Sequence, residues 1–105
     1  MNYRDLNPQE FKKAFEATKN AVLLDVRTPR EVADGKLAGA QTINFFDSDF
    51  SSKLSKMDPS KTYFVYCRSG NRSAQACMLL ANQGFEKLVN LTGGYSAWQL
   101  QFMFA

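Results

Sequence analysis

A cysteine followed by a polar loop with two arginines is the part of the sequence best suited to chemistry. Residues 63–73 read Tyr-Phe-Val-Tyr-Cys-Arg-Ser-Gly-Asn-Arg-Ser, so an aromatic, apolar run ends at Cys67 and polar residues follow. Residues 74–82 then have the composition of a helix. A cysteine between a strand and a helix N-terminus lies where unpaired backbone N–H groups converge. Such a position favours the thiolate over the thiol.

The loop after this cysteine has the properties of an anion cradle. Gly70 permits a sharp turn and close approach of the backbone to a ligand, and Asn71 tolerates left-handed conformations. No residue from 68 to 73 has an apolar side chain, so this segment is not what would be expected around an inert core cysteine. We therefore predict that Cys67 is reactive and that the loop stabilises its thiolate or a larger anionic sulfur species. The predicted binding residues are Arg68, Ser69, Gly70, Asn71, Arg72 and Ser73.

The residue counts exclude several kinds of chemistry. The chain has 105 residues, two cysteines and no histidine. A Ser-His-Asp or Cys-His catalytic group is therefore impossible within it, and a Cys/His zinc site lacks ligands. We predict no metal and no cofactor. A disulfide between Cys67 and Cys77 is not expected, because a loop and a helix separate them. Cys77 is interpreted as a small core residue, the alternative being a resolving or relay thiol that acts together with Cys67.

The distribution of charge argues against a polymeric ligand. The formal net charge is +3, but the basic residues are spread along the chain, so we predict no nucleic-acid binding. No apolar run approaches the length that spans a membrane, and the first residues lack a signal-peptide pattern. We expect a cytoplasmic protein that does not bind membranes.

Two segments carry complete signals for the start of a helix. Residues 7–10 and 28–31 each offer a capping side chain, a proline in the first helical position and a glutamate that completes a capping box. Gly35 is a natural stop for the second helix. Phe11 and Phe15 follow the first start at helical spacing and are predicted to lie in the core.

Apolar segments of strand length alternate with the predicted helices. The strands are expected at residues 21–26, 41–45, 61–66 and 88–91. Further helices are expected at about 50–57, 74–82 and 95–104. This alternation predicts an α/β fold with a mostly parallel sheet, in a single domain over residues 1–105. Ligands of such sheets bind beyond the carboxyl ends of the strands, which is where Cys67 ends its strand.

The spacing between cysteine and arginine separates two chemistries. Cysteine-dependent phosphatases use a similar strand–loop–helix cradle with five residues between the Cys and the Arg. Here four residues separate Cys67 from Arg72, and Ser73 occupies the position of the phosphatase arginine. A tighter ring of N–H groups suits the outer sulfur of a persulfide better than a tetrahedral phosphate.

At four segments the chain resembles the rhodanese family, and its single-domain thiosulfate sulfurtransferases in particular. These segments are Leu-Asp-Val-Arg-Thr-Pro-Arg-Glu (24–31), Gly-Lys-Leu-Ala-Gly-Ala (35–40), Cys-Arg-Ser-Gly-Asn-Arg-Ser (67–73) and Leu-Thr-Gly-Gly-Tyr-Ser-Ala-Trp (91–98). The resemblance implies a rhodanese-like fold, with a central parallel sheet of about five strands and helices on both faces. One departure is Lys36, which stands where the family usually has His.

The resemblance also implies a mechanism. Cys67 would take a sulfane sulfur from a small anionic donor such as thiosulfate and hold it as a persulfide, and cyanide or a thiol would remove it. Arg68 or Arg72 would help to hold the donor. The resemblance assigns structural roles to Asp25, Arg27 and Glu31.

Three alternatives stay open beside this mechanism. The first is a persulfide carrier that delivers sulfur to an acceptor protein. The second is an inactive interaction module, which the intact Cys67 disfavours. The third is a phosphatase or an arsenate reductase, which the loop length disfavours.

Overall fold

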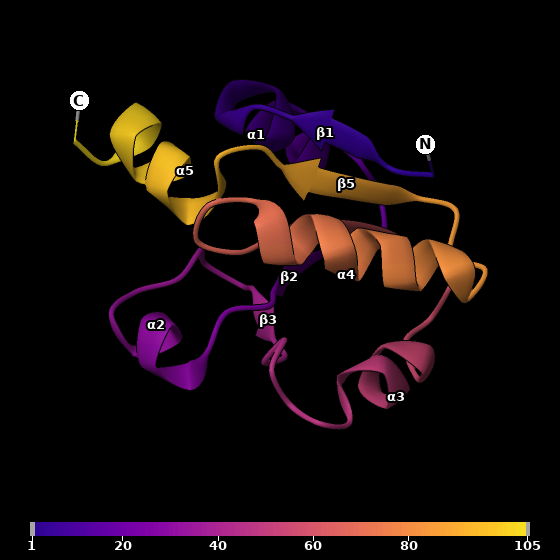
Figure 1. Cartoon of the computed structure of the whole chain (residues 1–105). Helices are drawn as coiled ribbons and strands as arrows, with labels where there is room; N and C mark the ends of the chain where they lie inside the picture. Colours follow the sequence, from indigo (N-terminus) through magenta and orange to yellow (C-terminus); the bar gives the residue numbers. More distant parts are fainter. Residues whose placement is uncertain (1, 105) are drawn as a thin grey trace.

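A computed structural model describes residues 2–104 and has one parallel β-sheet at its centre (Figure 1). Its strands lie in the order β1-β5-β4-β2-β3, and all paired neighbours are parallel. The strands are β1 (Arg4–Leu6), β2 (Ala21–Asp25), β3 (Gln41–Thr42), β4 (Thr62–Tyr66) and β5 (Leu88–Leu91). The predicted α/β fold with a parallel sheet of about five strands is confirmed.

Helices cover both faces of this sheet. They are α1 (Pro8–Ala17), α2 (Pro29–Ala33), α3 (Phe50–Ser55), α4 (Asn71–Asn82) and α5 (Gly94–Phe102). Phe11 of α1 and Tyr95 of α5 belong to the apolar cluster on one face, and Phe50 of α3 and Leu80 of α4 belong to the cluster on the other. The prediction of helices on both faces is confirmed.

The central strand β4 explains where the reactive loop is placed. Its side chains alternate between the two clusters: Tyr63 and Val65 pack with α3 and α4, whereas Phe64 and Tyr66 pack with α1 and α5. Burial on both faces is what makes the strand read as a continuous apolar run. Cys67 follows directly, so the loop starts at the carboxyl edge of the sheet, between β5 and β2.

Both predicted capping boxes are present. At α1, the Glu10 N–H donates to Asn7 Oδ1 at 2.9 Å, and the Asn7 N–H donates to Glu10 Oε1 at 3.1 Å. At α2, Thr28 and Glu31 exchange the same two bonds at 3.0 and 3.2 Å. A side-chain cap stabilises a helix by about 1 kcal/mol, which matters most for α2, because it has only five residues.

Several boundaries differ from the predictions. Strand β1 was not predicted, because its three residues, of which two are exposed, carry too little pattern to be recognised. The strand expected at 41–45 is regular only at Gln41–Thr42, the segment 50–57 is helical only to Ser55, and the last helix covers 94–102 rather than 95–104. Strand β2 ends at Asp25 and β4 begins at Thr62, one residue inside each expected range.

The structure places no membrane-spanning helix within residues 2–104, since none of its helices is both long and apolar enough.

Candidate active site

The Cys67 side chain is enclosed by hydrogen-bond donors of its own loop. Its Sγ lies 3.1 Å from the Gly70 backbone nitrogen, 3.4 Å from the Ser73 nitrogen and 3.3 Å from the Ser73 hydroxyl oxygen. Gly70 has a φ of 106°, a left-handed conformation that favours glycine, and it caps α4. Asn71 was predicted to tolerate a left-handed conformation but does not adopt one, because it is the first residue of α4.

These donors determine the ionisation of the thiol. Burial opposes the thiolate, since Cys67 is only 1% exposed. Hydrogen bonds from the hydroxyl and N–H of Ser73 and from the N–H groups of Gly70 and Ser69 outweigh burial. Together they hold the pKa of Cys67 below its usual value, without a neighbouring base. The loop can therefore stabilise a thiolate through backbone and hydroxyl groups.

The start of α5 turns the loop's N–H groups toward the sulfur. The Tyr95 N–H donates to the Cys67 carbonyl at 2.8 Å, and the Ser96 N–H donates to the Arg68 carbonyl at 3.0 Å. In a trans peptide the N–H points opposite to the C=O, so fixing these carbonyls outward directs the next N–H groups, including that of Ser69, inward. A Cβ on Gly94 would come within 2.5 Å of the Arg68 carbonyl group, so only glycine fits there.

The other end of the loop is held by a residue that the sequence analysis did not single out. Asn90 of β5 donates through Nδ2 to the Asp5 carboxylate at 2.9 Å and to the Gly70 carbonyl at 3.4 Å. Its Oδ1 is buried and has no partner within residues 2–104. A single asparagine in an otherwise apolar strand is the signal that could have identified this connection.

Arg72 is bound to Glu31 rather than free. Its guanidinium forms two hydrogen bonds with the Glu31 carboxylate at 2.8 and 2.9 Å and lies 5.6 Å from the centre of the Phe46 ring. Hydrogen bonds from Arg72 lower the pKa of Glu31 to about 2, although burial opposes this shift. Of the two arginines expected to hold an anionic donor, Arg72 is thus already paired with a carboxylate. Arg68 is exposed and forms no ion pair within residues 2–104.

Asp25 and Arg27 form a buried ion pair at 2.7 Å, with side chains 0% and 4% exposed. The Arg27 guanidinium also donates to the Gly35 carbonyl at 2.7 Å and lies over the Tyr95 ring at 4.4 Å. These contacts join the end of β2 to the segment after α2 and to α5. The two buried charges neutralise each other, and their contacts agree with the structural role that the resemblance implies for both residues.

Cys77 lies in a different environment. It faces the interior from α4, is fully buried and belongs to the apolar cluster of α3 and α4. Burial raises the pKa of Cys77 to about 12. Both cysteines are free in the structure. The environment of Cys77 is that of a core residue.

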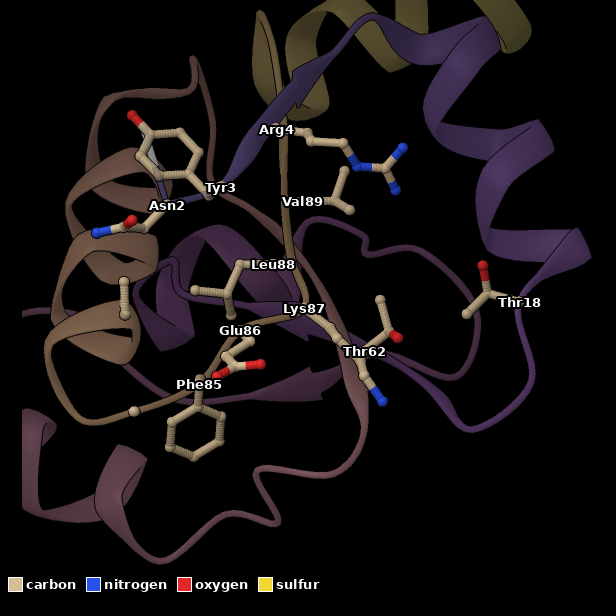
Figure 2. Close-up of a pocket in the computed structure, with 12 residues that line it drawn as sticks. Asn2, Tyr3, Arg4, Thr18, Thr62, Phe85, Glu86, Lys87, Leu88 and Val89 are labelled. Atoms are coloured by element: carbon tan, nitrogen blue, oxygen red, sulfur yellow. The ribbon is translucent and has the colours of Figure 1, made fainter.

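Two hollows differ in their relation to the loop. The larger, of about 700 Å³, lies at the amino-terminal ends of β1, β4 and β5, where Figure 2 shows Arg4, Thr62 and Lys87 around it. No residue of the Cys67 loop lines it. A smaller pocket of about 190 Å³ includes Arg68 and lies between the loop, α2 and α5. Among the described residues, no group of three His, Cys, Asp or Glu side chains is arranged to hold a metal ion.

Comparison with known proteins gives consistent matches. The family model of the rhodanese-like domain matches residues 7–101. YtwF of Bacillus subtilis is 36% identical over 99 residues, which cover 94% of this chain and 93% of YtwF. A sulfurtransferase of Allochromatium vinosum is 32% identical over 94 residues, with 90% and 86% covered. The crystal structure of a rhodanese-related protein from Thermoplasma volcanium superposes with a TM-score of 0.82 at 30% identity, covering 95% of this chain and 94% of that one.

Proposed function

Because this chain belongs to the rhodanese-like domain family, we propose that it is a sulfurtransferase that carries a sulfane sulfur as a persulfide on Cys67. Family membership supports an enzyme that transfers sulfur, and the names of both relatives above contain the word sulfurtransferase. The observation that carries the proposal is the ring of N–H and hydroxyl donors around the Cys67 sulfur. This ring favours an anionic sulfur and needs no histidine.

The first step is attack of the Cys67 thiolate on the outer sulfur of the donor. With thiosulfate, a new S–S bond forms at Sγ, the sulfur–sulfur bond of thiosulfate breaks, and sulfite leaves with the electron pair. The persulfide keeps one negative charge, which the N–H groups of Ser69, Gly70 and Ser73 stabilise as they did the thiolate. In the second step cyanide or a thiolate takes the outer sulfur, and Cys67 is again a thiolate.

A small anionic donor suits the charge at the mouth of the loop. Arg68 is exposed and free of ion pairs among the described residues, so it can attract such a donor. A relative from Ectopseudomonas mendocina named thiosulfate sulfurtransferase GlpE is 30% identical over 101 residues, covering 95% of this chain and 88% of GlpE. We propose thiosulfate, or a donor of similar charge, on these grounds.

Delivery of the sulfur to an acceptor protein is the second candidate. Phe46 favours it, because this aromatic ring is 66% exposed beside Arg72 at the rim of the site. Exposed aromatic residues of this kind are common at protein interfaces. We also propose a cytoplasmic setting, which agrees with two cysteines that both remain free.

Intact mass spectrometry tests the sulfur-transfer function. The protein is treated with thiosulfate, freed of excess reagent and weighed beside Cys67→Ser and Cys77→Ser. We expect the wild type and Cys77→Ser to gain one sulfur atom that cyanide removes, and Cys67→Ser to gain none. If no sulfane donor adds sulfur at Cys67, the proposal is wrong. Hydrolysis of an aryl phosphate that depends on Cys67 would instead support the phosphatase alternative.

A further inference from the structure

Asn90 is a buried polar residue within the apolar strand β5, where it is 4% exposed. Its register partners are Asp5 on β1 and Val65 on β4, so the three side chains lie on the same face of the sheet. Val65 packs with α3 and α4, which places the Asn90 amide on the side of the sheet where α4 lies. The Nδ2 bonds to the Asp5 carboxylate and the Gly70 carbonyl therefore join the edge strand to the cap of α4.

Packing alone does not explain an asparagine at this position. Its Oδ1 is buried without a hydrogen-bond partner in the described part of the chain, and such an acceptor destabilises the folded state. Neither group that accepts from Nδ2 depends on it, because Asp5 is exposed to water and the Gly70 carbonyl also accepts the Ala74 N–H at 3.2 Å. A leucine has the same branched shape and would bury no unpaired oxygen. What the amide adds at this position is a second contact on Gly70.

Gly70 connects the amide to the reacting sulfur. Its N–H is closer to Cys67 Sγ than either donor of Ser73 is, and its carbonyl accepts the first hydrogen bond of α4. Glycine has a wide choice of backbone conformations, so a second contact on this carbonyl narrows the choice. The Ser73 N–H, which also donates to Sγ, belongs to the helical turn that this carbonyl begins. Holding the carbonyl therefore fixes both N–H groups relative to the sulfur.

We propose that Asn90 is a positioning residue for the reaction at Cys67. Its amide holds the Gly70 carbonyl and thereby keeps the N–H groups of Gly70 and of the first turn of α4 directed at the sulfur. Asp5 orients the amide by accepting its other Nδ2 hydrogen. Asn90 acts through Gly70 and is therefore not itself catalytic. The assignment rests on the proposed function for the persulfide step, whereas its effect on the thiolate follows from the same N–H groups without sulfur transfer.

Asn90→Leu separates positioning from packing, because the two roles predict different changes. If Asn90 positions the loop, the free energy of unfolding should stay equal or rise, since the unpaired oxygen is removed. Alkylation of Cys67 near neutral pH should nevertheless slow about threefold, as for the loss of one hydrogen bond, and its apparent pKa should rise. Sulfite release from thiosulfate should slow by a similar factor. Chemical denaturation and alkylation rates across pH are measured in a Cys77→Ala background, in which Cys67 is the remaining thiol.

A matched pair of variants at Asp5 tests the other end of the contact without altering the core. Asp5→Asn and Asp5→Ala both remove an exposed charge, but only the asparagine keeps a side-chain oxygen that can accept from Asn90. We expect Asp5→Ala to alkylate at Cys67 about twofold more slowly than Asp5→Asn. Because the charge is lost in both variants, its direct effect on the thiolate cancels in this ratio.

The possible results overturn different claims. An Asn90→Leu protein that is as stable and as reactive as the wild type would overturn the positioning role. If Asn90→Leu is less stable or does not fold, the Asp5 pair decides, and equal alkylation rates in that pair would overturn the role. Failure of the wild type to take sulfur from any sulfane donor would overturn the proposed function, while the alkylation rates would still decide whether Asn90 positions the thiolate.

Discussion

Cys67 and Cys77 are both buried on the same side of the sheet, yet their surroundings have opposite effects on the two thiols. The pKa of Cys77 rises to about 12, mainly through burial and further through the negative charges of Asp5 and Cys67, whereas that of Cys67 is lowered. The difference is the set of hydrogen-bond donors that the loop directs at Cys67 Sγ. Burial thus fixes the cost of forming a thiolate, and the orientation of a few peptide groups decides whether that cost is exceeded.

The largest expected difference between the two cysteines is in turnover. Cys67→Ser should reduce the release of sulfite from thiosulfate to background, because the sulfur has no covalent carrier. Cys77→Ala should keep most of the turnover and lower the free energy of unfolding by about 1 kcal/mol, since it leaves a small cavity in the core. Turnover assays and chemical denaturation measure the two quantities. A large loss of turnover in folded Cys77→Ala would contradict the view that this residue only packs.

Gly94→Ala should disturb the loop around Cys67 but leave the apolar core around Cys77 unchanged. Its Cβ would lie 2.5 Å from the Arg68 carbonyl oxygen, at a backbone φ of 62° that disfavours side chains. We expect a loss of roughly 2–4 kcal/mol in the free energy of unfolding, from strain and overpacking together. We also expect the apparent pKa of Cys67 to rise, as followed by alkylation rates across pH. Gly84→Ala provides the control, because it shares a positive φ but meets no atom within 4 Å.

Alkaline pH should destabilise the protein through Cys77. The folded pKa of about 12 lies above the ordinary value of 9.0, so its contribution to stability is present below pH 9 and is lost as pH rises toward 12. Over that window the linked loss is about 1.4 kcal/mol per pH unit. The measurement is the free energy of unfolding of the wild type and Cys77→Ala between pH 8 and pH 10.5. The two curves should approach each other above pH 9 and cross before pH 10.5, because the linked loss in the wild type then exceeds the cavity effect of about 1 kcal/mol. Parallel curves would contradict the shift.

Ser73→Ala should make the Cys67 thiol slightly more like that of Cys77, with a higher pKa and a lower reactivity. It removes the hydroxyl 3.3 Å from Sγ but leaves the Ser73 and Gly70 N–H groups in place. We expect the apparent pKa of Cys67 to rise and its alkylation near neutral pH to slow about tenfold, as for a lost hydrogen bond to a charged group. Ser69→Ala is the matched control, since the Ser69 side chain forms no bond to Sγ within the described structure. Equal effects of both substitutions would show that the hydroxyl of Ser73 has no special role.

The features that were predictable from the sequence are those encoded locally. The capping boxes depend on residues three positions apart, and the loop signal depends on the polar residues directly after Cys67. The alternation of strands and helices was likewise predictable because the three central strands β2, β4 and β5 are largely apolar on both faces.

The connections that hold the loop were not predictable, because they join distant residues. Arg72 meets Glu31 across 41 positions, and Asn90 meets Asp5 across 85. Strand β1 escaped prediction for a related reason: its three residues are strand only because β5 lies beside them. The sequence could thus indicate a candidate reactive cysteine and its loop, whereas the distant partners of that loop required the fold.

The bonds from Tyr95 and Ser96 to the carbonyls of Cys67 and Arg68 have a consequence for biosynthesis. During translation Cys67 is synthesised before Tyr95 and Ser96, which come later in the chain. Until residue 96 has been made and α5 has docked, the loop lacks the contacts that orient its peptide groups. A nascent chain should therefore carry an ordinary, slowly oxidised thiol, and the sulfur becomes a strong nucleophile only when the last helix is in place.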